Sequence, residues 1–139
     1  MLAVTCYTKD YVSACRARVE SQVSAFKTLV AASAGAATMA ATSALEPIYF
    51  TNALLALDGH FVHRLRGAEG KDGNPLNEVR MLCNALLANG GVLAADKTIK
   101  YVPAKSVLQY EIGQPVQLSS QAFALLAEAF LGELERRYG

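Results

Sequence analysis

Two histidines, His60 and His63, lie three residues apart in the middle of the sequence. On a helix, two side chains with this spacing share one face and could hold a metal ion together. A stable metal site needs three or four ligands, and the chain has no other histidine. The three cysteines are widely spaced and none forms a CxxC pair, so they indicate neither a zinc site nor a disulfide framework. We therefore expect no metal and no cofactor.

The glycine-rich segment 67–74 is the second place where the sequence could support chemistry. It leads into the predicted start of a helix, where backbone amide groups favour anions. The spacing of its glycines and lysine does not match a phosphate-binding P-loop, and its two acidic residues would repel an anion. Basic and polar residues nevertheless occur on both sides of it, and they form a candidate site for a small anionic ligand: Asp58, His60, His63, Arg64, Lys71, Arg80 and Asn84.

Asp58 and Arg80 are the two members of this group that we expect to interact directly. A helical wheel places Asp58 between two apolar stripes, so its carboxylate should be at least half-buried and should need a partner. The helices that carry the two residues are joined by a short loop and should run antiparallel, which brings Arg80 and the neighbouring Asn84 within reach. The pair is either a structural tie between two helices or part of a ligand site.

Four segments have apolar residues at helical spacing and must position these side chains. We predict helices over residues 11–32, 43–66, 75–89 and 120–138. Each of the last three has a start signal: a Ser43–Glu46 capping box, Asn74 followed by Pro75, and Ser119 or Ser120. The alanine-rich segment 31–44 has no charge and one large apolar side chain, so we predict a mobile loop there.

Residues 98–102 and 107–112 are rich in β-branched and aromatic side chains and flank a turn that contains Pro103. This pattern predicts a two-stranded β-hairpin. The predicted fold is mainly α: a four-helix bundle with this small two-stranded β-hairpin inserted between the third and fourth helices, in a single domain over residues 1–139.

The predicted helix 43–66 carries two apolar stripes. One is formed by Phe50, Leu54, Leu57, Phe61 and Leu65. The other lies well over a quarter-turn away and is formed by Ile48, Leu55 and Val62. Such a helix is either the central helix of a monomer or an interface helix. Charged residues make up 18% of the chain, against about 25% in ordinary globular proteins, which favours a homodimer with the second stripe at its interface.

Composition limits the classes of partner. A net charge of +1 on 139 residues does not favour nucleic-acid or membrane-surface binding. The N-terminal residues do not resemble a secretory leader and no apolar run is long enough to span a bilayer, so we expect a cytoplasmic protein. We predict a non-enzymatic helical-bundle protein that acts through self-association and a protein partner. The alternative is a small anionic-ligand binding protein or enzyme with a pocket near residues 67–74.

Overall fold

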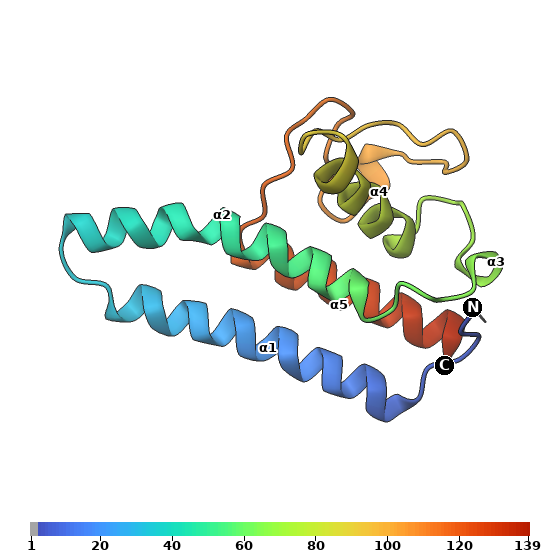
Figure 1. Ribbon diagram of the computed structural model, residues 1–139, viewed down its shortest axis with the longest axis horizontal. Coiled ribbons are helices and arrows are strands. Elements are labelled where there is room, and N and C mark those ends of the chain that lie inside the picture. The colour runs from blue at the N-terminus through green and yellow to red at the C-terminus, as the bar shows by residue number, and fades with distance from the viewer. Residues whose placement is uncertain (1–2) are drawn as a thin grey trace.

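The structure, a computed structural model, describes residues 3–139 (Figure 1). Two long helices, α1 and α2, form an antiparallel hairpin, and α5 packs against both of them. The shorter α4 lies across α2 and α5, and one turn of helix, α3, precedes it. The elements are α1 Lys9–Ala32, α2 Ala36–Gly59, α3 Arg66–Glu69, α4 Pro75–Ala88, the 3-10 helix η1 Pro103–Lys105, and α5 Ser120–Tyr138.

The central helix is α5, which contacts each of the other four α-helices. The side chain of Ser119 accepts a hydrogen bond from the amide of Ala122 and caps its N-terminus, as the sequence predicts. Seven of its side chains are buried: Phe123, Leu126, Ala127, Phe130, Leu131, Leu134 and Tyr138. The apolar stripe of α2 that contains Phe50 and Leu54 also faces this core. Because α5 takes the central position, one side of α2 stays uncovered.

The helix α2 includes the second half of the segment for which we predicted a loop. Alanine has the highest helix propensity, and this favours helix without large apolar anchors. The Thr42 hydroxyl donates to the Thr38 carbonyl and lies 2.9 Å from the Ser33 Oγ at the end of α1, which ties the hairpin together. Glu46 therefore lies inside the helix rather than in a capping box, and its carboxylate accepts from the amide of Ser120 at 2.9 Å.

The predicted β-hairpin is wrong, because residues 3–139 contain two isolated β-bridges and no β-strand. The backbone groups that a hairpin would pair with each other are bound by other parts of the fold. The Glu78 carboxylate on α4 accepts from the amides of Val107 and Leu108, at 2.8 and 3.0 Å. The Lys100 amide donates to the Lys71 carbonyl at 2.8 Å. The segment is therefore an irregular loop held on α4, with η1 in the middle of it.

The chain leaves the helical path at the end of α2, seven residues before the predicted helix end. Residues 60–65 form a turn that pairs with the N-terminal segment: the Val4 amide donates to the His63 carbonyl and the Leu65 amide to the Val4 carbonyl, both at 2.8 Å. This turn directs Arg64 into the interior, and Leu65 is exposed rather than part of a buried stripe. None of the helices within residues 3–139 has the length and apolar character that a membrane span requires.

Candidate functional site

A cluster of charged side chains is buried where α2, α3 and α4 meet near the end of α5. We call Asp58, Arg64, Glu69, Asn77 and Arg80 the buried ionic cluster. Glu69 is at its centre: one carboxylate oxygen accepts from Arg64 Nε at 2.8 Å and from Arg80 Nη2 at 2.6 Å. The other accepts from Arg80 Nε at 2.9 Å and from Asn77 Nδ2 at 3.0 Å. These four hydrogen bonds join α3 to α4 and to the turn after α2.

Arg64 is the most deeply buried cation of this cluster, with a side chain that is 0% exposed. Its Nη1 donates to Asp58 at 3.2 Å and to the Phe61 carbonyl at 3.0 Å. Its Nη2 is the single buried side-chain polar atom without a hydrogen-bond partner in the described part of the chain. The guanidinium carbon lies 5.5 Å from the centre of the Phe130 ring, and this contact offsets part of the missing hydrogen bond.

The electrostatics of the cluster favour ionised side chains. Burial alone would raise the pKa of Glu69, but the hydrogen bonds and charges of Arg80 and Arg64 outweigh burial, and its pKa lies below the ordinary value. The hydrogen bonding that Arg80 donates to Glu69 raises the pKa of Arg80, against the opposing effect of burial. Two guanidinium groups thus face two carboxylates, and the cluster has no net charge left to attract an anion.

The structure brings three of the predicted site residues together and changes their pairing. We predicted a contact between Asp58 and Arg80, but Asp58 pairs with Arg64 and Arg80 pairs with Glu69. The reason is the early end of α2, which moves Arg64 from a helix surface into the gap between the two predicted partners. Asp58 and Arg80 still belong to one cluster, and it links α2 with α4 as the structural interpretation requires.

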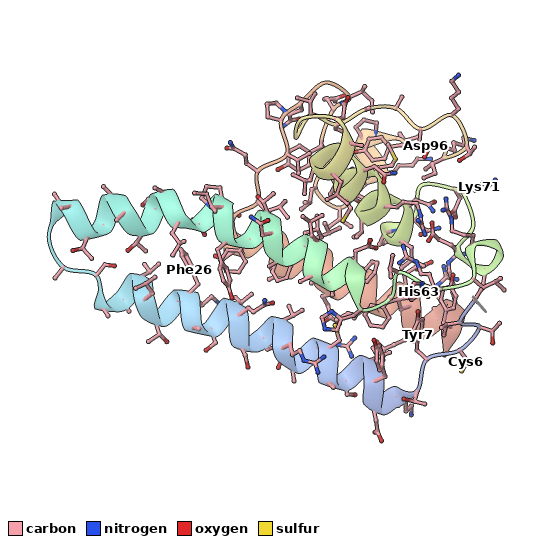
Figure 2. All side chains as sticks on the ribbon, in the orientation of Figure 1. Cys6, Tyr7, Phe26, His63, Lys71 and Asp96 are labelled. Carbon is pink, nitrogen blue, oxygen red and sulfur yellow. The ribbon has the colours of Figure 1, made fainter. Side chains whose placement is uncertain are left out.

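The other predicted site residues do not converge on this cluster. His60 is half-buried, with Nδ1 2.6 Å from the Ala56 carbonyl, and His63 is exposed. Lys71 is exposed on the loop after α3, while His63 lies near the end of α2 (Figure 2). Asn84 is exposed and lines a separate hollow of about 260 Å³ that also contains Asp96. Within residues 3–139, no three histidine, cysteine or acidic side chains are grouped closely enough to hold a metal ion.

Sequence reasoning missed Glu69 and Glu78, the two acidic residues that organise this half of the molecule. We expected the acidic residues of segment 67–74 only to repel an anion, whereas Glu69 is 2% exposed and binds two arginines. Glu78 lies on the buried face of α4. Burial raises its pKa, against the lowering effect of the hydrogen bonds from Leu108 and Val107. The one sequence signal for the structural role of Glu78 was its place at a core position of an amphipathic helix.

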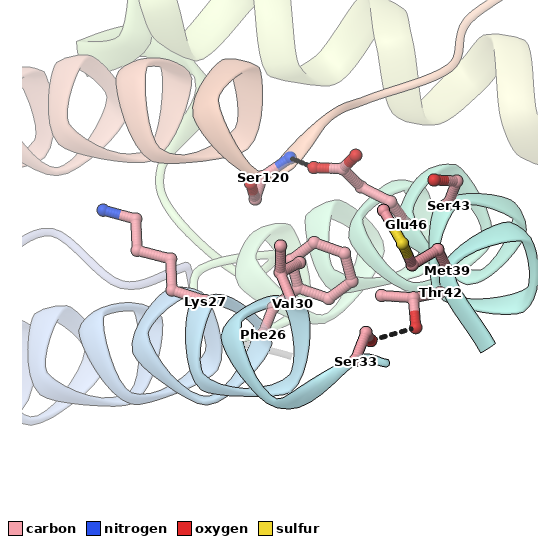
Figure 3. Close-up of a pocket in the computed structure, with 9 residues that line it drawn as sticks. All are labelled: Phe26, Lys27, Val30, Ser33, Met39, Thr42, Ser43, Glu46 and Ser120. Carbon is pink, nitrogen blue, oxygen red and sulfur yellow. Dashed lines mark hydrogen bonds between the residues drawn. The ribbon is translucent and has the colours of Figure 1, made fainter. Parts of the chain in front are cut away.

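A hollow of about 390 Å³ lies between the α1–α2 hairpin and the start of α5 (Figure 3). Phe26, Val30 and Met39 supply its apolar lining. Lys27 and Glu46 are its only ionisable lining residues, and Glu46 is engaged with the Ser120 amide. Among the described residues, the hydroxyl groups of Ser33, Thr42, Ser43 and Ser120 also line it, and no histidine does.

The chain was compared with protein-family models, with curated proteins and with solved structures, and none of the three comparisons found a match. The function is therefore inferred from the physical features of the chain.

Proposed function

We propose that this protein is a non-enzymatic helical protein that acts through self-association, as a homodimer formed through the exposed face of α2. The observation that carries the proposal is the chemistry of that face. Every residue of α2 that is exposed to solvent, from Ala36 to Gly59, is uncharged. The surfaces of proteins that remain monomeric ordinarily carry many charged residues of both signs.

The predicted interface residues support the proposal to different degrees. Ile48 is 63% exposed and Val62 is 48% exposed, so this chain does not cover them. Leu55 is half-buried and packs against the core, so it would lie at the edge of an interface. Fully burying a side chain such as isoleucine contributes about 1.5–3 kcal/mol. Burying the exposed part of Ile48 would then contribute roughly 1–2 kcal/mol per copy.

The alternative function, binding of a small anionic ligand near segment 67–74, has weaker support. The two arginines that would bind an anion already contact carboxylates. Lys71 is exposed on the loop after α3. A cytoplasmic setting belongs to the main proposal and is supported by three free cysteines, because thiols stay reduced in that compartment.

The test is the mass of the protein in solution, measured by light scattering over a range of micromolar concentrations. We expect a dimer for the wild type and a folded monomer for Ile48→Glu, because a carboxylate cannot be buried there without a partner. Leu125→Glu is the matched control, since Leu125 is 56% exposed on α5 and also gains a carboxylate. A wild type that is monomeric at every concentration would overturn the proposal, as would dissociation of the control alone.

A further inference from the structure

The exposed face of α2 presents a protruding side chain next to an apolar hollow. Ile48 protrudes, and it lies between Leu45 and Tyr49, one helical turn or less from each. The hollow has a volume of about 190 Å³ and lies between α1 and α2. It is uncharged, and its lining residues are Gln22, Ala25, Phe26, Leu29, Leu45 and Tyr49.

This hollow opens on the side of the hairpin that faces away from α5. At 100° per residue, Leu45 lies about 140° around α2 from Phe50, which packs on Phe123 of α5. The larger hollow beside Ser120 opens toward α5 instead, and Phe26, between the two helices, lines both hollows. Figure 1 shows α5 passing behind α2, so the near face of the hairpin has no element of this chain over it.

We propose that Ile48 of a second copy of this chain occupies the hollow, and that the two copies exchange this contact symmetrically. The inference rests on the proposed function and specifies the contact through which the copies meet. A two-fold interface requires one self-complementary surface, and here Ile48 lies about 60° around α2 from Leu45, which lines the hollow. An apolar cavity of about 150 Å³ holds benzene, so the present hollow can accept the branched side chain of isoleucine.

The size of the hairpin fits this kind of contact. α1 and α2 have 24 residues each, so each is about 36 Å long at a rise of about 1.5 Å per residue. Two helices side by side, each about 10 Å wide, present a face of about 700 Å². Stable interfaces bury about 600–1,000 Å² on each partner. The hairpin face is therefore large enough for a second copy, whereas the 190 Å³ hollow alone would accept a single side chain.

The first variant fills the hollow and leaves Ile48 unchanged. In Ala25→Trp, an indole added at an exposed lining residue occupies the space, and we expect the dimer to dissociate while helical content is unchanged. Ile48→Ala shortens the exposed side chain, and we expect its dimer dissociation constant to rise about 30- to 700-fold, because each dimer loses two buried side chains. Ala104→Trp, which adds an indole at an exposed residue of η1, is the control and should stay dimeric.

Sedimentation equilibrium on the wild type, these three variants and Ile48→Glu separates the outcomes. Dissociation by Ala25→Trp together with the weakening by Ile48→Ala supports the exchange of Ile48 side chains. A dimeric wild type that Ile48→Glu breaks and Ala25→Trp leaves intact would refute the contact with the hollow, while self-association would stand. A monomeric wild type would refute the proposed function itself.

Discussion

Replacement of Glu69 by glutamine tests the buried ionic cluster most directly. Glutamine keeps the shape of the side chain but removes the charge opposite Arg64 and Arg80, and the amide nitrogen that replaces one carboxylate oxygen can only donate where that oxygen accepted. The Glu69 side chain is 3% exposed and water cannot take its place. Breaking a buried ion pair by removing one partner typically costs about 3–5 kcal/mol. We expect a loss of that size in the free energy of unfolding.

Urea unfolding followed by circular dichroism measures this loss. For a chain of 139 residues, each kcal/mol lost from the free energy of unfolding lowers the melting temperature by about 3–4 °C. The melting temperature of Glu69→Gln should therefore fall by about 10–20 °C. Glu128→Gln is the control, because Glu128 is 67% exposed and its ion pair with Arg16 should contribute less than about 1 kcal/mol. If the free energy of unfolding falls by the same small amount in both variants, the cluster does not hold α3 and α4 together and its structural role is refuted.

Two further predictions concern acid and backbone conformation. The pKa of Glu69 is lower in the folded chain than its ordinary value near 4.5. The contribution of Glu69 to the free energy of unfolding is therefore complete above pH 4.5 and is lost as the pH falls through the folded pKa. The difference in melting temperature between wild type and Glu69→Gln should therefore shrink in acid, and a constant difference would contradict the reasoning. Gly73→Ala should cost about 1–3 kcal/mol, since φ is +86° and a Cβ would meet a backbone carbonyl of the neighbouring loop. Gly67→Ala, with open space around it in α3, should be near neutral, and equal urea midpoints for the two variants would argue against strain at Gly73.

Much of the helical framework could be predicted from the sequence because its signals are local. The apolar period along α1 and α5 and the cap residues Asn74 and Ser119 act within one or two turns of the chain. The Asn74 side chain accepts from the amides of Leu76 and Asn77, with Pro75 in the first turn, as predicted. Of the second predicted stripe, Ile48 is exposed on α2, Leu55 is half-buried, and Val62 is exposed on the turn that follows α2.

The secondary-structure prediction was wrong where residues distant in the sequence bind the same polar groups. Residues 98–112 have the composition of strands, but Glu78 binds two of their amides from a helix about thirty residues earlier. The alanine-rich start of α2 was expected to lack anchors, but hydroxyl contacts between Ser33, Thr42 and Thr38 tie it to the end of α1. Neither contact leaves a periodic signal in the sequence.

The sequence by itself determined the helices α1, α4 and α5, the middle of α2 and which of their faces are apolar, because periodicity and capping depend on neighbours along the chain. Only the tertiary structure decided which charges meet. Arg64 forms ion pairs with Asp58 and with Glu69, and Glu69 also pairs with Arg80. These contacts arise because α2 ends at Gly59 and the following turn pairs with Val4. The partners of buried charges depend on three-dimensional proximity and desolvation, and a helical wheel contains neither.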